Sequence, residues 1–224
     1  MIGTVGQVNR GSKLGEIIYN LCLQDDVKNI VEIGTWNGMG STKCIYDAIS
    51  EKKGEYLVYS LECNKEFYNI CLKNYENLPK LDNFNLILGT IISPDDNIDP
   101  VSNFDDSFFK ESSRDIQKSW YMEDLENCKN VPNVLNIIPD QIDLLILDGG
   151  EFSSLAEYKK LKESTTYFIL DDTNSIKNNE VSNLIRNDIR YQVIHDSNDR
   201  NGFLVAKKIH TKVKRFFSVR TNIN

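Results

Sequence analysis

The sequence lacks an uninterrupted apolar stretch of the length that a membrane-spanning helix needs, about 18 residues or more. The first residues, Met1 to Arg10, also lack the basic start and apolar block of a secretory signal. Both absences argue against a membrane protein and against export. We therefore expect a cytoplasmic protein without a membrane span.

Histidine is scarce, and cysteine follows no metal-binding pattern. The chain has 2 histidines and 5 cysteines, and no two cysteines are spaced as C-x-x-C. Structural zinc sites usually draw their ligands from such spacings, so a zinc centre is not expected. The odd number of cysteines fits free, buried thiols in a reducing compartment.

Basic residues are also fewer than acidic ones. The chain has 26 Lys and Arg residues against 33 Asp and Glu residues, which gives a formal net charge of −7. A protein that grips a phosphate backbone normally has the opposite balance, so we expect no nucleic-acid partner. Only the tail at about 209–224 is basic, and it is either a solvated end or a contact for an anionic partner.

What the sequence does contain is a regular alternation of short apolar runs and segments of helical periodicity. Continuous apolar runs are typical of strands that are buried on both faces of a parallel sheet, and the last two runs are spaced as a hairpin. The pattern predicts one α/β domain over 1–224, Rossmann-like and doubly wound, with a mostly parallel seven-stranded sheet and an antiparallel C-terminal hairpin strand. The expected strands are 29–33, 56–61, 84–88, 142–147, 167–170, 191–195 and 202–206, and the expected helices are 13–23, 40–49, 65–75, 120–128, 155–161 and 181–189.

The stretch at about 92–131 interrupts this alternation. It holds an acidic, Asn-rich loop over 94–106 and the helix expected at 120–128. A long insertion near the open end of a sheet is commonly functional, so we interpret it as a lid or a substrate wall. Its Trp120-Tyr121-Met122 stretch is a candidate contact for a homo-oligomer.

The first expected strand runs into a glycine-containing turn, Gly34-Thr35-Trp36-Asn37-Gly38. Glycines between a strand and a helix let the backbone turn tightly and approach a ligand, although a purely structural turn is the alternative. Glu62 ends the next strand, where a carboxylate can accept two hydrogen bonds from a ribose diol. Trp36 stands where a dinucleotide fingerprint has its second glycine, and this favours a phosphate-free ligand such as S-adenosylmethionine over NAD.

The run from Val31 to Ser41 resembles the first motif of class I S-adenosylmethionine-dependent methyltransferases, and is closest to the metal-dependent sugar and small-molecule O-methyltransferase branch. The similarity extends over about 12–208, outside the insertion, through Glu62, Leu147-Asp148-Gly149-Gly150, Leu170-Asp171-Asp172 and Asn201-Gly202-Phe203.

The resemblance implies an enzyme that transfers a methyl group from S-adenosylmethionine to a hydroxyl of a small polar acceptor. The implied acceptor is a sugar or glycan precursor, free, phosphorylated or nucleotide-linked, as in polysaccharide biosynthesis. The residues that we expect to contact the cofactor are Glu32, Gly34, Thr35, Trp36, Gly38, Ser41, Glu62, Gly89 and Asp148.

Two neighbouring strands are expected to end in carboxylates, Asp148 on one and the pair Asp171-Asp172 on the next. Carboxylates that share a site repel each other, so they need a cation or raised pKa values, and oxygen-only ligands suit Mg²⁺. Acidic residues at these places hold magnesium in the branch that the chain resembles, which implies a metal site formed by these three aspartates. Helix capping, or recognition of a substrate amine or hydroxyl without metal, are the alternatives.

The catalytic base is where the sequence departs from the branch. Relatives usually have a histidine three residues after the first aspartate, and here Glu151 takes that place. Glu151 is therefore a candidate base or a fourth metal ligand, and His195 is the other candidate base. Asp148 is the third candidate catalytic residue. Two other functions stay open: an NAD-dependent oxidoreductase or epimerase, and a non-catalytic S-adenosylmethionine-binding module.

Overall fold

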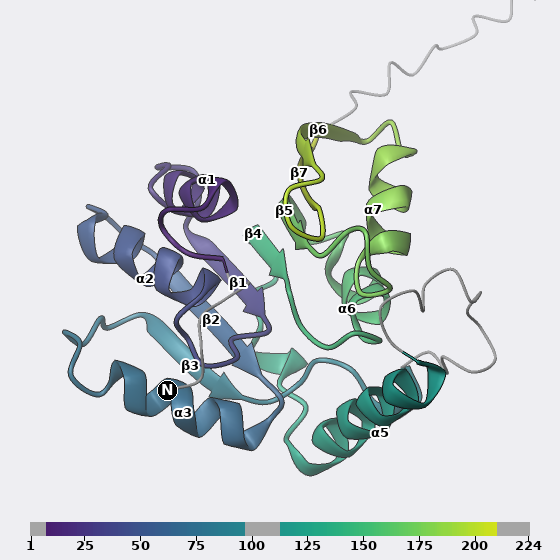
Figure 1. Cartoon of the computed structure of the whole chain (residues 1–224). Coiled ribbons are helices and arrows are strands. Elements are labelled where there is room, and N and C mark those ends of the chain that lie inside the picture. The colour runs from purple at the N-terminus through teal and green to yellow at the C-terminus, as the bar shows by residue number, and fades with distance from the viewer. Residues whose placement is uncertain (1–7, 97–112, 210–224) are drawn as a thin grey trace, which may run out of the picture.

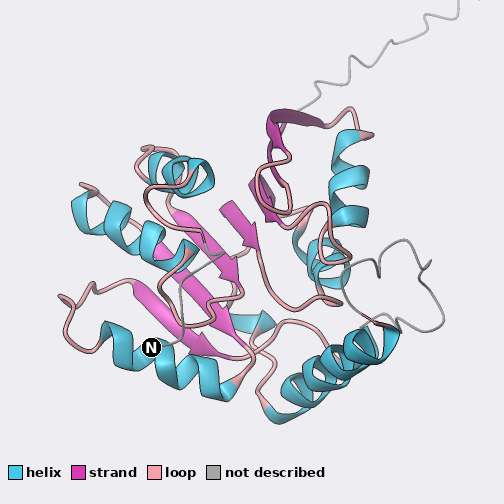
Figure 2. Cartoon of the chain, in the orientation of Figure 1, coloured by secondary structure: helices cyan, strands magenta, loops and turns pink. Residues whose placement is uncertain are grey.

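The fold is described from a computed structural model, which covers residues 8–96 and 113–209. One sheet of seven strands runs through the molecule in the order β3-β2-β1-β4-β5-β7-β6 (Figure 2). Neighbours from β3 to β5 are parallel, whereas β7 is antiparallel to both β5 and β6. This confirms the predicted fold class. The strands are β1 (Asn29–Ile33), β2 (Leu57–Glu62), β3 (Phe84–Leu88), β4 (Ile142–Leu147), β5 (Thr165–Asp171), β6 (Tyr191–Ser197) and β7 (Phe203–Lys208).

The central strand β4 is apolar along almost its whole length because side chains from both of its faces are buried. Successive residues of a strand point to opposite faces, and in β4 Leu145 and Leu147 join one apolar cluster while Leu144 and Ile146 join the other. All four side chains are no more than 1% exposed. The continuous apolar run is thus the sequence signature of a sheet covered on both sides.

Helices supply the two covering layers, with α1, α2 and α3 on one side of the sheet and α5, α6 and α7 on the other (Figure 1). In α1 the buried residues Leu14, Ile18 and Leu21 recur at helical spacing, and they pack in the cluster that also contains Leu144 of β4. The helices are α1 (Lys13–Cys22), α2 (Ser41–Glu51), α3 (Lys65–Tyr75), α5 (Arg114–Asn130), α6 (Ser154–Leu161) and α7 (Asn179–Arg186).

The helix α5 begins six residues before the predicted start at 120, at Arg114. Ser113 caps it by accepting a hydrogen bond from the backbone N–H of Ile116 at 3.4 Å, and Pro132 follows just beyond its end at Asn130. Most of the predicted acidic loop at 94–106 and nearly all of the basic tail at 209–224 lie outside the described residues.

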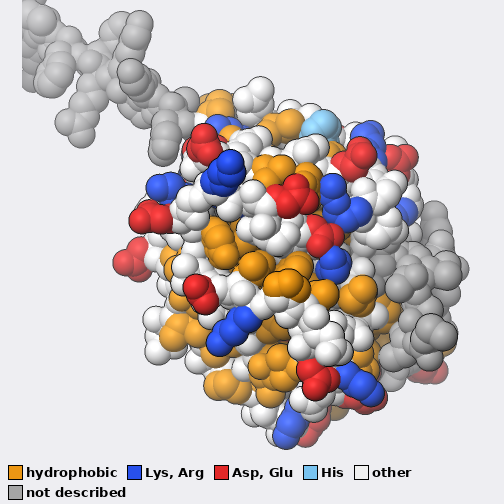
Figure 3. Space-filling model, turned by 90° about the vertical axis from the view of Figure 1, so that its left-hand side faces the viewer, with side chains coloured by type: hydrophobic (Ala, Val, Ile, Leu, Met, Phe, Trp, Pro, Cys, Tyr) orange, Lys and Arg blue, Asp and Glu red, His pale blue; other side chains and the backbone are white. Residues whose placement is uncertain are grey.

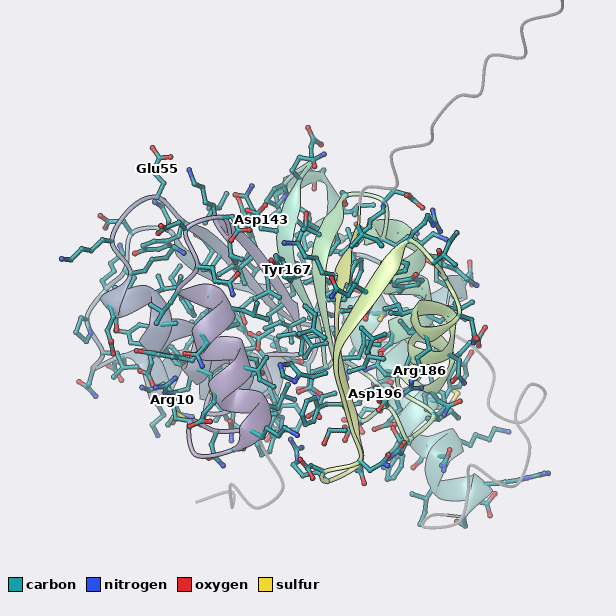
Figure 4. The ribbon with its side chains drawn as sticks, turned by 90° about the horizontal axis from the view of Figure 1, so that it is seen from above. Arg10, Glu55, Asp143, Tyr167, Arg186 and Asp196 are labelled. Atoms are coloured by element: carbon teal, nitrogen blue, oxygen red, sulfur yellow. The ribbon has the colours of Figure 1, made fainter. Side chains whose placement is uncertain are left out.

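At the molecular surface, acidic and basic side chains are interspersed with apolar ones on the face shown in Figure 3. Arg186 of α7 and Asp196 of β6 lie side by side in Figure 4, and Arg186 Nε donates to Asp196 Oδ2 at 2.8 Å. No helix among the described residues is long and apolar enough to cross a membrane. All five cysteines are free, as predicted, and four are buried while Cys63 is partly exposed.

Candidate functional site

The turn after β1 brings the ends of two strands into backbone contact. Gly34 has a φ of 100°, and a Cβ there would stand 2.1 Å from the carbonyl oxygen of Asp148, which follows β4. Gly38 has a φ of 77°, and its Cβ would stand 2.5 Å from Cys71 Sγ. Because no side chain fits at either position, the glycines are a requirement of this turn.

A cavity of about 580 Å³ opens at the carboxyl ends of β1, β2, β4 and β5. Its size lies in the range of small-molecule sites, and ligands of open parallel sheets bind at this end of the strands. In Figure 1 the arrowheads of β1, β2 and β3 mark the carboxyl ends of these strands. Of the predicted cofactor contacts, those that line it are Gly34, Thr35, Trp36, Ser41, Glu62, Gly89 and Asp148.

Glu62 is held rigidly at the rim of β2. Its two carboxylate oxygens accept backbone N–H groups, one from Trp36 at 2.6 Å and the other from Asn64 at 2.8 Å. The side chain is only 7% exposed, and burial raises its pKa. Each oxygen keeps a further lone pair, so a fixed acceptor of two hydrogen bonds faces the cavity.

Glu32 lies beneath the turn and does not line the cavity. It is fully buried, accepts the Thr42 hydroxyl at 2.8 Å and also accepts Ser60. Burial raises its pKa to about 7. Its contacts tie β1 to β2 and to α2, so the structure places it as a support of the turn, and Gly38 likewise stays outside the cavity lining.

Asp148, Asp171 and Asp172 do come together, as predicted. One carboxylate oxygen from each lies within 4.8 Å of those of the other two. Their partners are basic side chains: Lys177 Nζ donates to Asp148 Oδ1 at 3.1 Å and to Asp172 Oδ2 at 2.9 Å. Arg200 lies 3.2 Å from Asp171 Oδ2. Each of the three carboxylates therefore already has a cationic partner from the chain itself.

The charges of this cluster shift its pKa values in opposite directions. Burial, with the neighbouring charge of Asp148, raises the pKa of Asp171 to about 7. For Asp172 burial acts upward, but the Lys177 ammonium outweighs it and holds the pKa below its usual range. Burial opposes the charged form of Lys177 too, yet Asp148 and Asp172 hold its pKa well above its usual value. Lys177 is thus a permanent cation at neutral pH.

Helix capping does not account for the three aspartates. The N-cap of α6 is Ser153 and that of α7 is Asn178, so neither helix begins on one of these carboxylates. Asp172 instead has a φ of 55°, in the left-handed region that non-glycine residues seldom adopt. The capping alternative is therefore wrong for this cluster.

The opposite wall of the cavity is acidic as well, and α5 supplies much of it. Asp124 packs so closely on Gly150 that a Cβ there would stand 2.6 Å from Asp124 Oδ2. Burial raises the pKa of Asp124 to about 7 and that of Glu157 to about 8. Burial also raises the pKa of Glu151. The α5 residues that line the cavity are Trp120, Glu123, Asp124, Asn127 and Cys128.

The predicted catalytic residues divide into two groups. Glu151 and Asp148 line the cavity. His195 lies in β6, the outermost strand, opposite Val205 of β7, and does not line the cavity. A base must reach the proton that it removes, so the position of His195 does not suit that role.

Sequence reasoning missed Lys177, Asp124 and Glu157. Lys177 follows Asp172 by five residues, but nothing in its local sequence separates it from a solvated lysine. Asp124 and Glu157 sit on helices, where acidic residues are ordinarily exposed. A usable signal was that Glu157 falls between Ala156 and Tyr158, one turn before Leu161, on the apolar side of α6.

No protein-family model matches the chain, and no curated protein matches its sequence. Solved structures do match. An O-methyltransferase from Bacillus cereus in complex with SAH aligns with a TM-score of 0.56 at 15% identity, over 88% of this chain and 81% of that one. An SAH-bound methyltransferase from Podospora anserina aligns with a TM-score of 0.57 at 14% identity, over 87% of this chain and 77% of that one.

A putative caffeoyl-CoA O-methyltransferase from Staphylococcus aureus aligns with a TM-score of 0.55 at 14% identity, over 88% of this chain and 83% of that one. At such identities the likeness establishes a shared fold. The chain therefore has the Rossmann-like α/β fold of these methyltransferases.

Proposed function

We propose that the chain is an S-adenosylmethionine-dependent O-methyltransferase that acts on a hydroxyl of a small polar acceptor, a sugar or glycan precursor. The observation that carries the proposal is the cavity at the strand ends, where the Gly34-Thr35-Trp36 turn faces the fixed carboxylate of Glu62. The shared fold with S-adenosylhomocysteine-bound methyltransferases supports it.

The cofactor half of the cavity suits a nucleoside without phosphates. Glu62 offers two oriented oxygens, which match the two hydroxyls of a ribose. Trp36 also lines the cavity, and it stands where a dinucleotide fingerprint has the glycine that lets the backbone approach a pyrophosphate. These features favour S-adenosylmethionine over NAD, and with it a transferase over an oxidoreductase.

The acceptor half of the cavity is formed by α5 and by the segment after β4. Its carboxyl groups, among them Asp124 and Glu151, provide hydrogen-bonding partners for a molecule with several hydroxyl groups. This lining supports a sugar-like acceptor, and it gives the insertion that contains α5 the role of a substrate wall.

The proposed reaction is a direct displacement. The acceptor oxygen attacks the methyl carbon, the new O–C bond forms as the S–C bond breaks, and the electron pair of that bond stays on sulfur. Glu151 takes the hydroxyl proton. Burial raises its pKa, which makes it a stronger base than an exposed carboxylate. Holding the two reactants in line supplies the rest of the rate enhancement.

The predicted magnesium ion can be compared with the residues present. Three aspartate oxygens are a suitable donor set for a hard cation. Lys177 and Arg200, however, already pair with all three carboxylates, so the cluster does not fit a resident divalent cation. No step of the proposed reaction passes through a metal.

The experiment is a transfer assay with methyl-labelled S-adenosylmethionine and a panel of monosaccharides, sugar phosphates and nucleotide sugars. We expect label on an acceptor hydroxyl, and a rate lower by about 100-fold or more in Glu151→Gln, because loss of a general base typically costs that much. Glu66→Gln is the matched control and should keep most of the activity, because Glu66 is exposed on α3 and lies outside the cavity lining. Absence of label on every sugar of the panel would contradict the proposed acceptor class.

A further inference from the structure

The Lys177 side chain reaches two of the three clustered aspartates. Its Nζ contacts Asp148 Oδ1 and Asp172 Oδ2 at 3.1 and 2.9 Å, and its side chain is 10% exposed. A surface lysine that merely swings toward an acidic patch would be far more exposed. Both aspartates are among the three residues whose oxygens lie within 4.8 Å of one another.

The backbone next to Lys177 is fixed to the strand ends that bear these aspartates. The adjacent Asn178 is fully buried, and its Nδ2 donates to the carbonyl oxygens of Leu147 at 3.0 Å and Asp171 at 2.7 Å. Leu147 and Asp171 are the last residues of β4 and β5. The segment before α7 is therefore tied to both strands, and this holds Lys177 at the cluster.

Arg200 completes the charge compensation. Its guanidinium lies 3.2 Å from Asp171 Oδ2, and Asp171 is the one aspartate of the three that Lys177 does not contact. A divalent ion in the cluster would share its ligands with two cations of the protein and would be repelled by both.

We propose that Lys177 is the resident cation of this cluster in place of a divalent metal, and that the chain works without one. Two N–H groups of its ammonium are used by Asp148 and Asp172. The third has no hydrogen-bond partner among the described residues, and Lys177 lines the cavity. This third N–H group is available to donate a hydrogen bond to the acceptor oxygen and so to favour loss of that oxygen's proton. This last step rests on the proposed function.

The test is a titration with Mn²⁺, followed by its electron paramagnetic resonance signal, on the wild type and on Lys177→Ala. We expect no saturable binding to the wild type up to about 1 mM, and binding of one ion at least about tenfold tighter in Lys177→Ala, since the competing charge is gone. Lys160→Ala is the matched control, because Lys160 pairs with Asp96 outside the cluster, at 3.3 Å, and should leave Mn²⁺ binding unchanged.

Saturable binding to the wild type that disappears in Asp171→Asn would overturn the proposal, and so would a Lys177→Ala variant that folds but binds no more tightly. The wild-type arm decides the matter even where Lys177→Ala fails to fold. The readout does not depend on methyl transfer, so it separates this proposal from the proposed function. If transfer is observed, EDTA should change the wild-type rate by less than about twofold, and a strict requirement for added metal would also refute the proposal.

Discussion

Glu157 places a buried carboxyl group in the wall of the cavity, and its replacement by glutamine should stabilise the protein in a pH-dependent way. The residue is 3% exposed, and its Oε2 has no hydrogen-bond partner among the described groups. Burial raises its pKa from an ordinary 4.5 to about 8. The folded protein therefore holds a proton that the unfolded chain releases between these two pH values.

The sign and size of the effect follow from proton linkage. Where the folded state binds more protons, the free energy of unfolding falls as pH rises, by at most about 1.4 kcal/mol per pH unit. The wild-type carboxyl should thus cost little near pH 4.5 and about 3 kcal/mol at pH 7, with no further loss above pH 8. Glutamine, which has nearly the same shape and stays neutral, removes this cost.

Urea unfolding at pH 5, 6 and 7, monitored by tryptophan fluorescence, measures the difference between Glu157→Gln and the wild type. The variant should gain stability over the wild type by about 1 kcal/mol or less at pH 5 and by about 3 kcal/mol at pH 7. Other titrating groups contribute equally to the stability of both proteins, so their contributions cancel in the difference. Glu76→Gln, at the exposed end of α3, should change stability by less than about 0.5 kcal/mol. A difference that does not grow with pH would refute the reasoning.

Three further substitutions test the architecture of the site. Gly34→Ala should lower the free energy of unfolding, measured with urea, by about 3 kcal/mol or more, because its Cβ would meet the Asp148 carbonyl. Gly54→Ala is the control. Gly54 has a φ of 115° but no atom within 4 Å of its Cβ position, so this variant should lose only about 1 kcal/mol of the same free energy. Glu62→Ala should weaken S-adenosylmethionine binding by about 10- to 100-fold in calorimetry, through the loss of charged hydrogen bonds. Asn178→Ala should lose about 2–4 kcal/mol of stability, since two buried strand-end carbonyls lose their donor.

The sheet could be predicted from sequence because its signal is local. The strands β1, β3 and β4 have the predicted bounds, since buried parallel strands are continuous apolar runs closed by polar residues. The start of α5 was missed because most of that helix is exposed, and its first turn from Arg114 has no apolar stripe.

The site could be predicted only in part. The meeting of Asp148 with Asp171 and Asp172 follows from strand adjacency, which the alternating pattern implies. The pairing of Lys177 with Asp148 spans 29 residues and depends on how the segment before α7 is tied to two strand ends. Such a tertiary contact leaves no periodic trace in the sequence, and the same holds for the packing of Asp124 on Gly150.

The most direct measurement of the proposed function is a calorimetric titration of the purified protein with S-adenosylmethionine, with NAD as the comparison ligand. The cavity predicts saturable binding of one S-adenosylmethionine and no binding of NAD at concentrations of about 1 mM, since Trp36 stands in place of the glycine that lets the backbone approach a pyrophosphate. Saturable binding of NAD, or no heat of binding for S-adenosylmethionine at that concentration, would contradict the assignment of this cavity as a methyl-donor site.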